Sequence, residues 1–228
     1  MKKLLLFDID GTLVDTGGAG QVSLRTALHT AFNTSKGLDK IVLDGATDLG
    51  IARELLSQNA LPQTDENVSK LLDAYLVVLQ KQLPKRQGRL LPGVQPLLQS
   101  LQKHSPEKCL IALLTGNIAR GAKLKLSHYS IWDFFSFGSF ADKHQNRNDL
   151  GPQAQQLAFE KTGKHFAPAD IFVIGDTPRD IECGKAIGAI TVAVATGNYS
   201  QETLAKHNPD LLFPDFSNTT TVIKALLG

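Results

Sequence analysis

Four short, mostly apolar runs recur along this chain of 228 residues, and stretches with helical periodicity separate them. The runs cover residues 4–9, 109–114, 170–174 and 190–195. Runs of this length that are hydrophobic on both faces suit strands buried inside a parallel sheet. Strands that alternate with helices are typical of a doubly wound α/β fold, which we therefore expect here.

The helices of this alternation are expected over residues 94–103, 119–127, 153–161 and 179–187, where the spacing of apolar residues has helical periodicity. A weaker strand at 211–213 and a closing helix at 219–227 would complete the sheet. The predicted core is thus a Rossmann-like parallel sheet with helices packed on it.

One region, residues 16–88, breaks the alternation because it contains no convincing strand. Its apolar residues instead follow i, i+3, i+4 spacing in three groups, which begin at Leu24, Ile51 and Val68. We predict a helical cap over residues 16–88, inserted into a core made of residues 1–15 and 89–228. The cap is entered through Thr-Gly-Gly at 16–18 and left through residues 84–93, which hold two prolines and two glycines. Such joints let a lid hinge.

Composition excludes several classes of function. Lys+Arg 24 against Asp+Glu 22 leaves a net charge of +2, so no general electrostatic field attracts nucleic acid or an acidic membrane.

The apolar run at residues 4–7 is too short for a secretion signal. Cys109 and Cys183 lack metal-ligand or redox spacing, so we expect buried, reduced thiols and a cytoplasmic protein.

Polar residues follow three of the predicted strands at the edge where ligands bind in open α/β sheets. They are Asp8 and Asp10 after the first, Thr115-Gly116-Asn117 after the second and Asp176 after the third, with Asp180 one helical turn later. Carboxylates gathered at one edge repel, and Mg²⁺ removes that conflict while also binding phosphate oxygen. The sequence therefore favours phosphoryl transfer, in which one carboxylate is the nucleophile and another moves protons.

Simpler explanations exist for some of these residues. An Asp-Gly pair such as Asp10-Gly11 often just ends a strand in a turn, and a calcium loop is excluded because Ala19 stands where its glutamate is needed. Thr115 has the alternative role of starting a helix. Residues 177–180 match a helix capping box, which is an alternative role for Asp180, although the metal role is favoured. Capping does not explain Asp176, which precedes the cap.

These motifs resemble those of the haloacid dehalogenase superfamily. The segments Asp8-Ile9-Asp10-Gly11-Thr12, Leu113-Leu114-Thr115-Gly116-Asn117 and Gly175-Asp176-Thr177-Pro178-Arg179-Asp180 are similar to its first, second and fourth motifs, in the same order. The helical insertion is similar to the small α-helical cap of the phosphoglycolate phosphatase-like branch. The resemblance implies a phosphatase that hydrolyses small phosphorylated metabolites, works as a monomer or homodimer and needs no nucleic acid or membrane.

The resemblance also implies a role for each motif residue. Asp8 would be the nucleophile and Asp10 the general acid and base. Mg²⁺ would be held by the Asp8 carboxylate, the Asp10 backbone carbonyl and Asp176, with Asp180 acting directly or through water. Thr115 and the backbone N–H groups of Gly116 and Asn117 would hold the phosphoryl oxygens. We further expect the four acidic side chains to converge around the ion.

The third motif of the family is a lysine or arginine before the helix that leads to the next strand. We choose Arg147 because its offset from the helix at 153–161 is closest to that of the family, and Lys143 is the runner-up. Either cation would offset charge between nucleophile and phosphate. For any one residue of the segment 143–149, an ordinary solvated loop is an equal alternative.

Three other functions compete with the phosphatase. A phosphosugar mutase would use the same core, a dehalogenase would not need Asp10 or a metal, and a phosphoacceptor signalling module would lack residues 16–88. Within the cap, the loop Gly45-Ala46-Thr47-Asp48 falls where relatives dip a basic residue toward the site. Ala46 offers no such contact, which weakens the assignment of phosphoglycolate. The loop is alternatively a plain helix N-cap.

Overall fold

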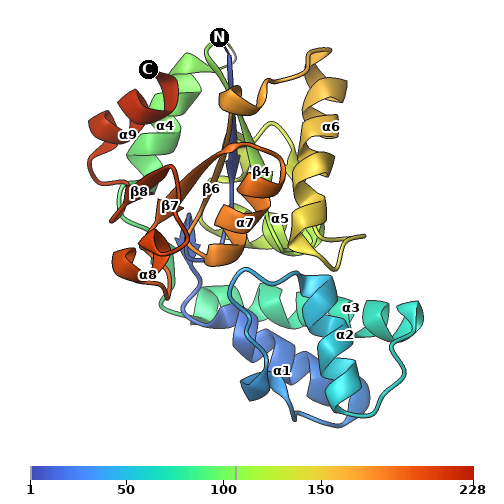
Figure 1. Cartoon of the computed structure of the whole chain (residues 1–228). Helices are drawn as coiled ribbons and strands as arrows, with labels where there is room; N and C mark the ends of the chain where they lie inside the picture. Colours follow the sequence, from blue (N-terminus) through green and yellow to red (C-terminus); the bar gives the residue numbers. More distant parts are fainter. Residues whose placement is uncertain (1, 106) are drawn as a thin grey trace.

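The computed structural model describes residues 2–105 and 107–228, and its centre is a six-stranded parallel sheet (Figure 1). The strand order is β5-β4-β1-β6-β7-β8. The chain adds strands first on one side of β1 and then on the other, so the order reverses beside β1. The bounds are β1 Lys3–Phe7, β4 Cys109–Leu114, β5 Gly138–Ser139, β6 Ile171–Gly175, β7 Ile190–Val194 and β8 Leu211–Phe213.

Both faces of the sheet are buried, as the apolar runs predict. Leu5 and Phe7 of β1 pack in one cluster with α4, α5 and α9, whereas Leu4 and Leu6 pack in another with α6 and α7. The short helix α8 packs near β7 through Leu204. The bounds are α4 Val94–His104, α5 Ala119–His128, α6 Leu150–Thr162, α7 Pro178–Ala186, α8 Gln201–Ala205 and α9 Thr219–Leu227. The predicted α/β fold class is confirmed.

Most predicted elements form within a few residues of their expected bounds. The first strand is an exception of interest because it ends at Phe7, two residues early. The chain turns there, and the backbone N–H groups of Leu13 and Val14 both donate to the carbonyl of Ile9. Strand β5 and helix α8 were not predicted. Each is too short to show a periodic pattern.

The segment between β1 and α4 folds into three helices beyond one end of the sheet (Figure 1). They are α1 Ala19–Phe32, α2 Asp48–Gln58 and α3 Asp65–Gln82. These helices bury an apolar cluster that includes Leu28, Leu55 and Leu71 and that Ile118, just before α5, also joins. The two connections to the sheet run side by side because β2 (Val14–Asp15) pairs antiparallel with β3 (Arg89–Leu90).

One further sequence expectation concerns the two cysteines. Cys109 and Cys183 are both buried and unpaired, as expected. Across residues 2–105 and 107–228, none of the helices combines the length and the apolar character that crossing a membrane requires.

Candidate active site

Three neighbouring strands bring the motif residues to one edge of the sheet. Asp8 follows β1, Thr115 follows β4 and Asp176 follows β6, and in the sheet these strands lie in the order β4-β1-β6. The reversal of strand order beside β1 opens a crevice at the carboxyl ends, where ligands bind in this architecture. A cavity of about 500 Å³ lies there, which is a typical size for a small-molecule site.

The loop after β1 is shaped by Gly11. Its φ of +79° lies in the left-handed region, and a Cβ atom there would collide with the carboxylate of Asp176. The loop also anchors that carboxylate, because the Thr12 hydroxyl donates to Oδ1 of Asp176 at 2.9 Å. Gly11 is therefore required both by the turn and by the close approach of Asp176, which follows β6.

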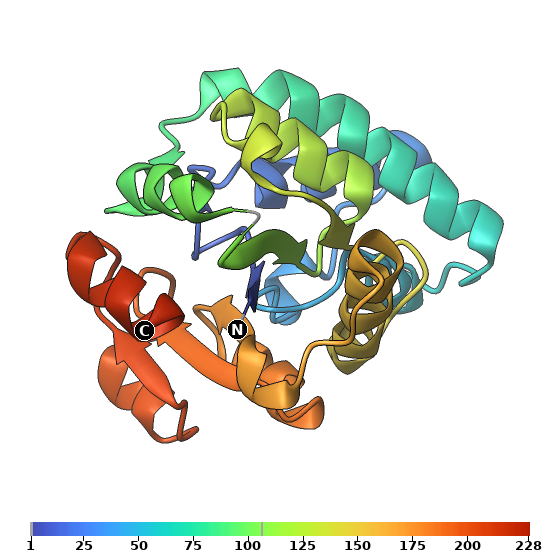
Figure 2. The same ribbon diagram turned by 90° about the horizontal axis from the view of Figure 1, so that it is seen from above.

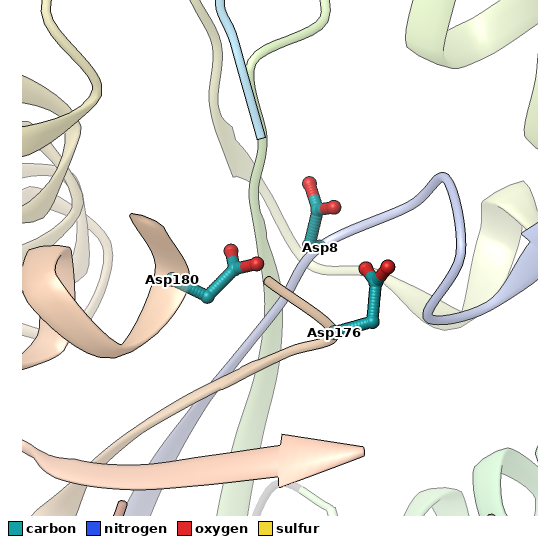
Figure 3. Close-up of side chains that lie close together, drawn as sticks. All are labelled: Asp8, Asp176 and Asp180. Atoms are coloured by element: carbon teal, nitrogen blue, oxygen red, sulfur yellow. The ribbon is translucent and has the colours of Figure 1, made fainter. Parts of the chain in front are cut away.

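The carboxylates of Asp8, Asp176 and Asp180 form a cluster whose ligand oxygens all lie within 4.8 Å of one another (Figure 3). All three residues are buried. Asp180 is held on α7 by a complete capping box, in which its side chain accepts from the Thr177 backbone N–H and the Thr177 hydroxyl accepts from the Asp180 N–H. The predicted capping role and a place in the cluster therefore both hold for Asp180.

The cation beside this cluster is Arg147. Its Nη2 lies 2.9 Å from Oδ1 of Asp8 and also contacts Oδ1 of Asp180. Its Nη1 donates to the Gly45 carbonyl at 3.2 Å. Arg147 is buried, whereas Lys143 is exposed. Of the two candidates for the third motif, the structure brings Arg147 to Asp8 and leaves Lys143 in solvent.

Buried negative charge exceeds positive charge in the cluster, since three carboxylates face one guanidinium. Burial raises the pKa of Asp8 from its ordinary 3.8 to about 6; Arg147 opposes the shift, and Asp180 and Asp10 add to it. Burial likewise raises the pKa of Asp176, with further contributions from Asp180 and Asp8. A hard divalent cation with oxygen ligands would remove this imbalance, so the donor set fits Mg²⁺.

The side chain of Asp10 lies outside the cluster. Its Oδ2 accepts from Lys125 Nζ at 2.6 Å and from Asn117 Nδ2 at 2.8 Å. The expectation that four acidic side chains meet around one ion is therefore wrong for Asp10, because its carboxylate is drawn away by these two donors. Its backbone carbonyl remains a predicted ligand.

The segment after β4 is covered by the helical region. The Thr115 hydroxyl is fully buried and accepts from Asn117 Nδ2 at 2.9 Å, while Gly116 and Asn117 line the cavity. The Gly116 carbonyl accepts from the Asp48 N–H at 2.7 Å. A Cβ atom on Gly116 would collide with the Ala46 carbonyl, so glycine permits this contact.

The loop at residues 45–48 reaches the cavity, and it also starts the helix α2. Gly45 and Ala46 line the cavity, and Thr47 is the N-cap of α2, its hydroxyl accepting from the Gly50 N–H. The Asp48 carboxylate accepts from the Ile118 N–H of the core at 2.9 Å. Burial raises the pKa of Asp48 to about 6, and the charge of Lys125 opposes the shift.

Sequence reasoning missed Lys125, which is buried on α5 and contacts both Asp10 and Asn117. The amino-acid sequence did contain a signal that Lys125 is buried. Lys125 lies three residues after Ala122 and next to Leu126, so helical geometry places it near the buried face of α5. A lysine on a buried face calls for a charged partner, and the aspartates at the sheet edge were available.

Comparisons with known proteins found a matching family and several similar proteins. The family model described as "Haloacid dehalogenase-like hydrolase" matches residues 5–194. The chain is 27% identical to "Probable phosphatase IndB" of Dickeya dadantii over 100% of this chain and 96% of that protein. It is 26% identical to a phosphoglycolate phosphatase of Haemophilus influenzae over 97% of this chain and 98% of that protein. The crystal structure of a "predicted phosphoglycolate phosphatase" from Haemophilus somnus superposes with a TM-score of 0.73 at 20% identity, covering 97% of both chains.

Proposed function

Because the chain belongs to the haloacid dehalogenase-like hydrolase family, we propose that it is a Mg²⁺-dependent phosphatase that hydrolyses small phosphomonoesters through a phosphorylated Asp8. It is a phosphoglycolate phosphatase-like phosphoric monoester hydrolase. The observation that carries the proposal is the pairing of Asp8 with Arg147 inside a cluster completed by Asp176 and Asp180.

The first half of the reaction would be attack by a carboxylate oxygen of Asp8 on phosphorus. The bond from phosphorus to the ester oxygen breaks, and Asp10 gives that oxygen a proton. Arg147 supports the attack because it offsets charge between the carboxylate and the incoming phosphate. In the second half, Asp10 takes a proton from water, which attacks phosphorus and releases phosphate from Asp8.

The metal would be held by the carboxylates of Asp8 and Asp176 and the backbone carbonyl of Asp10, with Asp180 as a direct or water-mediated ligand. Bound there, Mg²⁺ would supply positive charge to the phosphoryl oxygens. Thr115 and the amides of Gly116 and Asn117, which follow β4, would hold those oxygens from the other side of β1.

Residues 16–88 would serve as the cap of this enzyme, with residues 1–15 and 89–228 as its catalytic core. Support comes from the apolar cluster that residues 16–88 supply almost entirely and from the cavity between that region and the motif residues. The paired connections β2 and β3 are the natural hinge. Closure of the cap would exclude water while the phosphorylated aspartate forms.

The setting of the enzyme is a separate proposal. Two buried, unpaired thiols at Cys109 and Cys183 support a reducing compartment, and we place the enzyme in the cytoplasm as a monomer or homodimer.

A panel of phosphorylated acids, sugars and nucleotides tests the proposal. Release of inorganic phosphate that depends on Mg²⁺ and on Asp8 supports it. A phosphoryl group that stays on a rearranged sugar would instead identify a mutase, and hydrolysis that survives Asp8→Asn would refute the assignment of the nucleophile.

A further inference from the structure

The carboxylate of Asp10 is held asymmetrically. Oδ2 accepts two hydrogen bonds, from Lys125 Nζ at 2.6 Å and from Asn117 Nδ2 at 2.8 Å. No donor from residues 2–105 or 107–228 reaches Oδ1 within hydrogen-bond distance. The side chain of Asp10 is 43% exposed, whereas that of Lys125 is 5% exposed. Oδ2 is thus fixed by Lys125 and Asn117, and Oδ1 is left free by the described residues on the side of the cavity that Asp10 lines.

The three side chains form a closed triangle, because Lys125 also donates to Asn117 Oδ1 at 2.6 Å. Asn117 in turn donates to the buried Thr115 hydroxyl, which anchors it to the end of β4. Each corner of the triangle therefore has two contacts that fix its direction. A carboxylate held in this way loses the rotational freedom that an exposed aspartate normally keeps.

Lys125 is a costly residue to bury for packing alone, since a buried ammonium group loses its hydration. The helical region covers it. Figure 2 shows α3 alongside α5, and Tyr75 of α3 and Asp48 of α2 both act on the charge of Lys125. Burial opposes its charged form, but Asp10, Tyr75 and Asp48 outweigh burial and raise the pKa of Lys125. It therefore stays a cation.

We infer that Lys125 is a positioning residue for Asp10, which together with Asn117 fixes Oδ2 so that Oδ1 exchanges the proton with the leaving oxygen. This inference rests on the proposed function. Lys125 itself transfers no proton and touches no reacting atom. Its effect is confined to the step in which Asp10 protonates the departing group.

The test uses two substrates that differ in their need for that proton. The leaving group of an alkyl phosphate is a strongly basic alkoxide, so its departure depends on a proton from the acid. The leaving group of p-nitrophenyl phosphate is a stable phenolate, which departs without that proton. For Lys125→Met we expect kcat on the alkyl phosphate turned over fastest in the panel to fall about 100-fold, within the range of general acid catalysis. On p-nitrophenyl phosphate the loss should be a few-fold, about that expected for weakened packing.

Three variants separate positioning from a structural effect. Lys125→Arg, which keeps the charge and a donor, should recover part of the loss. Lys123→Met is a matched control, because Lys123 is exposed on the same helix and should behave as wild type on both substrates. Asp10→Asn combined with Lys125→Met should be no slower than Asp10→Asn alone, since residues that act through one another are non-additive.

Equal losses on both substrates, or a double variant slower by the product of the two single effects, would overturn the inference. If Lys125→Met does not fold, Lys125→Gln keeps the polarity without the charge and gives the same readout. Failure of the proposed function looks different. In that case Asp8→Asn would still hydrolyse both substrates, whatever Lys125 does.

Discussion

Arg147 Nη2 lies 2.9 Å from Asp8 Oδ1, although the two residues are 139 positions apart in the chain. The same nitrogen contacts Asp180, so one guanidinium links the first and fourth motifs. Such a cation stabilises the charge that accumulates when a carboxylate approaches a phosphate. Arginine suits this place because it keeps its charge when buried.

Replacing this arginine should therefore harm catalysis far more than replacing its neighbour in the loop. For Arg147→Ala we expect kcat/KM to fall by about 100-fold or more, as when a preorganised electrostatic donor is removed. Lys143→Ala should stay close to wild type because Lys143 is exposed. Steady-state kinetics on one good substrate checks both, and the reverse order would mean that the wrong cation was chosen.

Removal of the metal should stop turnover. The three buried carboxylates leave an uncompensated charge that Mg²⁺ is suited to neutralise. We expect a chelator to abolish phosphate release and added Mg²⁺ to restore it, while Asp176→Asn should raise the Mg²⁺ concentration needed for half-maximal rate. Full activity in the presence of chelator would contradict the role given to this cluster.

The metal-free protein should also lose stability as pH rises. Folding raises the pKa of Asp8 from 3.8 to about 6, so the folded state holds a proton that the unfolded chain has released. The free energy of unfolding therefore falls as pH rises from 3.8 toward about 6, and the buried Asp176 acts in the same direction. Thermal unfolding in chelator at about pH 5 and about pH 8 measures this effect.

Added Mg²⁺ is the control for that measurement. It should raise the unfolding temperature more at the higher pH, since carboxylates bind metal only after losing their protons. A metal-free protein that is equally stable at both values would contradict the charge imbalance.

The charge on the side of the cavity formed by residues 16–88 leads to a prediction about substrate choice. Of the described residues between 16 and 88 that line the cavity, the charged ones are Asp44 and Asp48, and neither is a cation. Ala46→Arg should therefore raise kcat/KM for 2-phosphoglycolate relative to glycerol 3-phosphate by about tenfold, the worth of one charge-assisted hydrogen bond. Initial rates on the two substrates give the ratio.

A matched control is Val42→Arg, which adds the same charge at an exposed position outside this cavity. It should leave the ratio unchanged. If Ala46→Arg also leaves it unchanged, the loop at 44–48 does not contact the leaving group.

Much of this architecture could be predicted from the sequence because its signals are local. Apolar runs mark the strands, and the residues just after them reach one edge whatever the details of packing, which is why Asp8 and Asp176 were found. Arg147 was chosen because its offset from the following helix is closest to that of the family whose motifs the chain resembles. The short strand β5 carried no such signal, since Gly138 and Ser139 are defined by pairing with β4.

The direction of the Asp10 side chain lay beyond sequence reasoning for a different reason. Its backbone position follows from the motif, but its carboxylate turns toward Lys125, 115 residues away. That partner becomes visible only when α5 packs beside the loop after β1. The local pattern of α5 places Lys125 near a buried face, but which carboxylate it meets depends on tertiary packing.

The most direct measurement of the central claim is to quench the enzyme in acid during turnover and to map the covalently bound phosphoryl group by mass spectrometry of its peptides. We predict a phosphoryl group on Asp8 that is absent from Asp8→Asn. A phosphoryl group on another residue, or hydrolysis by Asp8→Asn at the wild-type rate, would contradict the account.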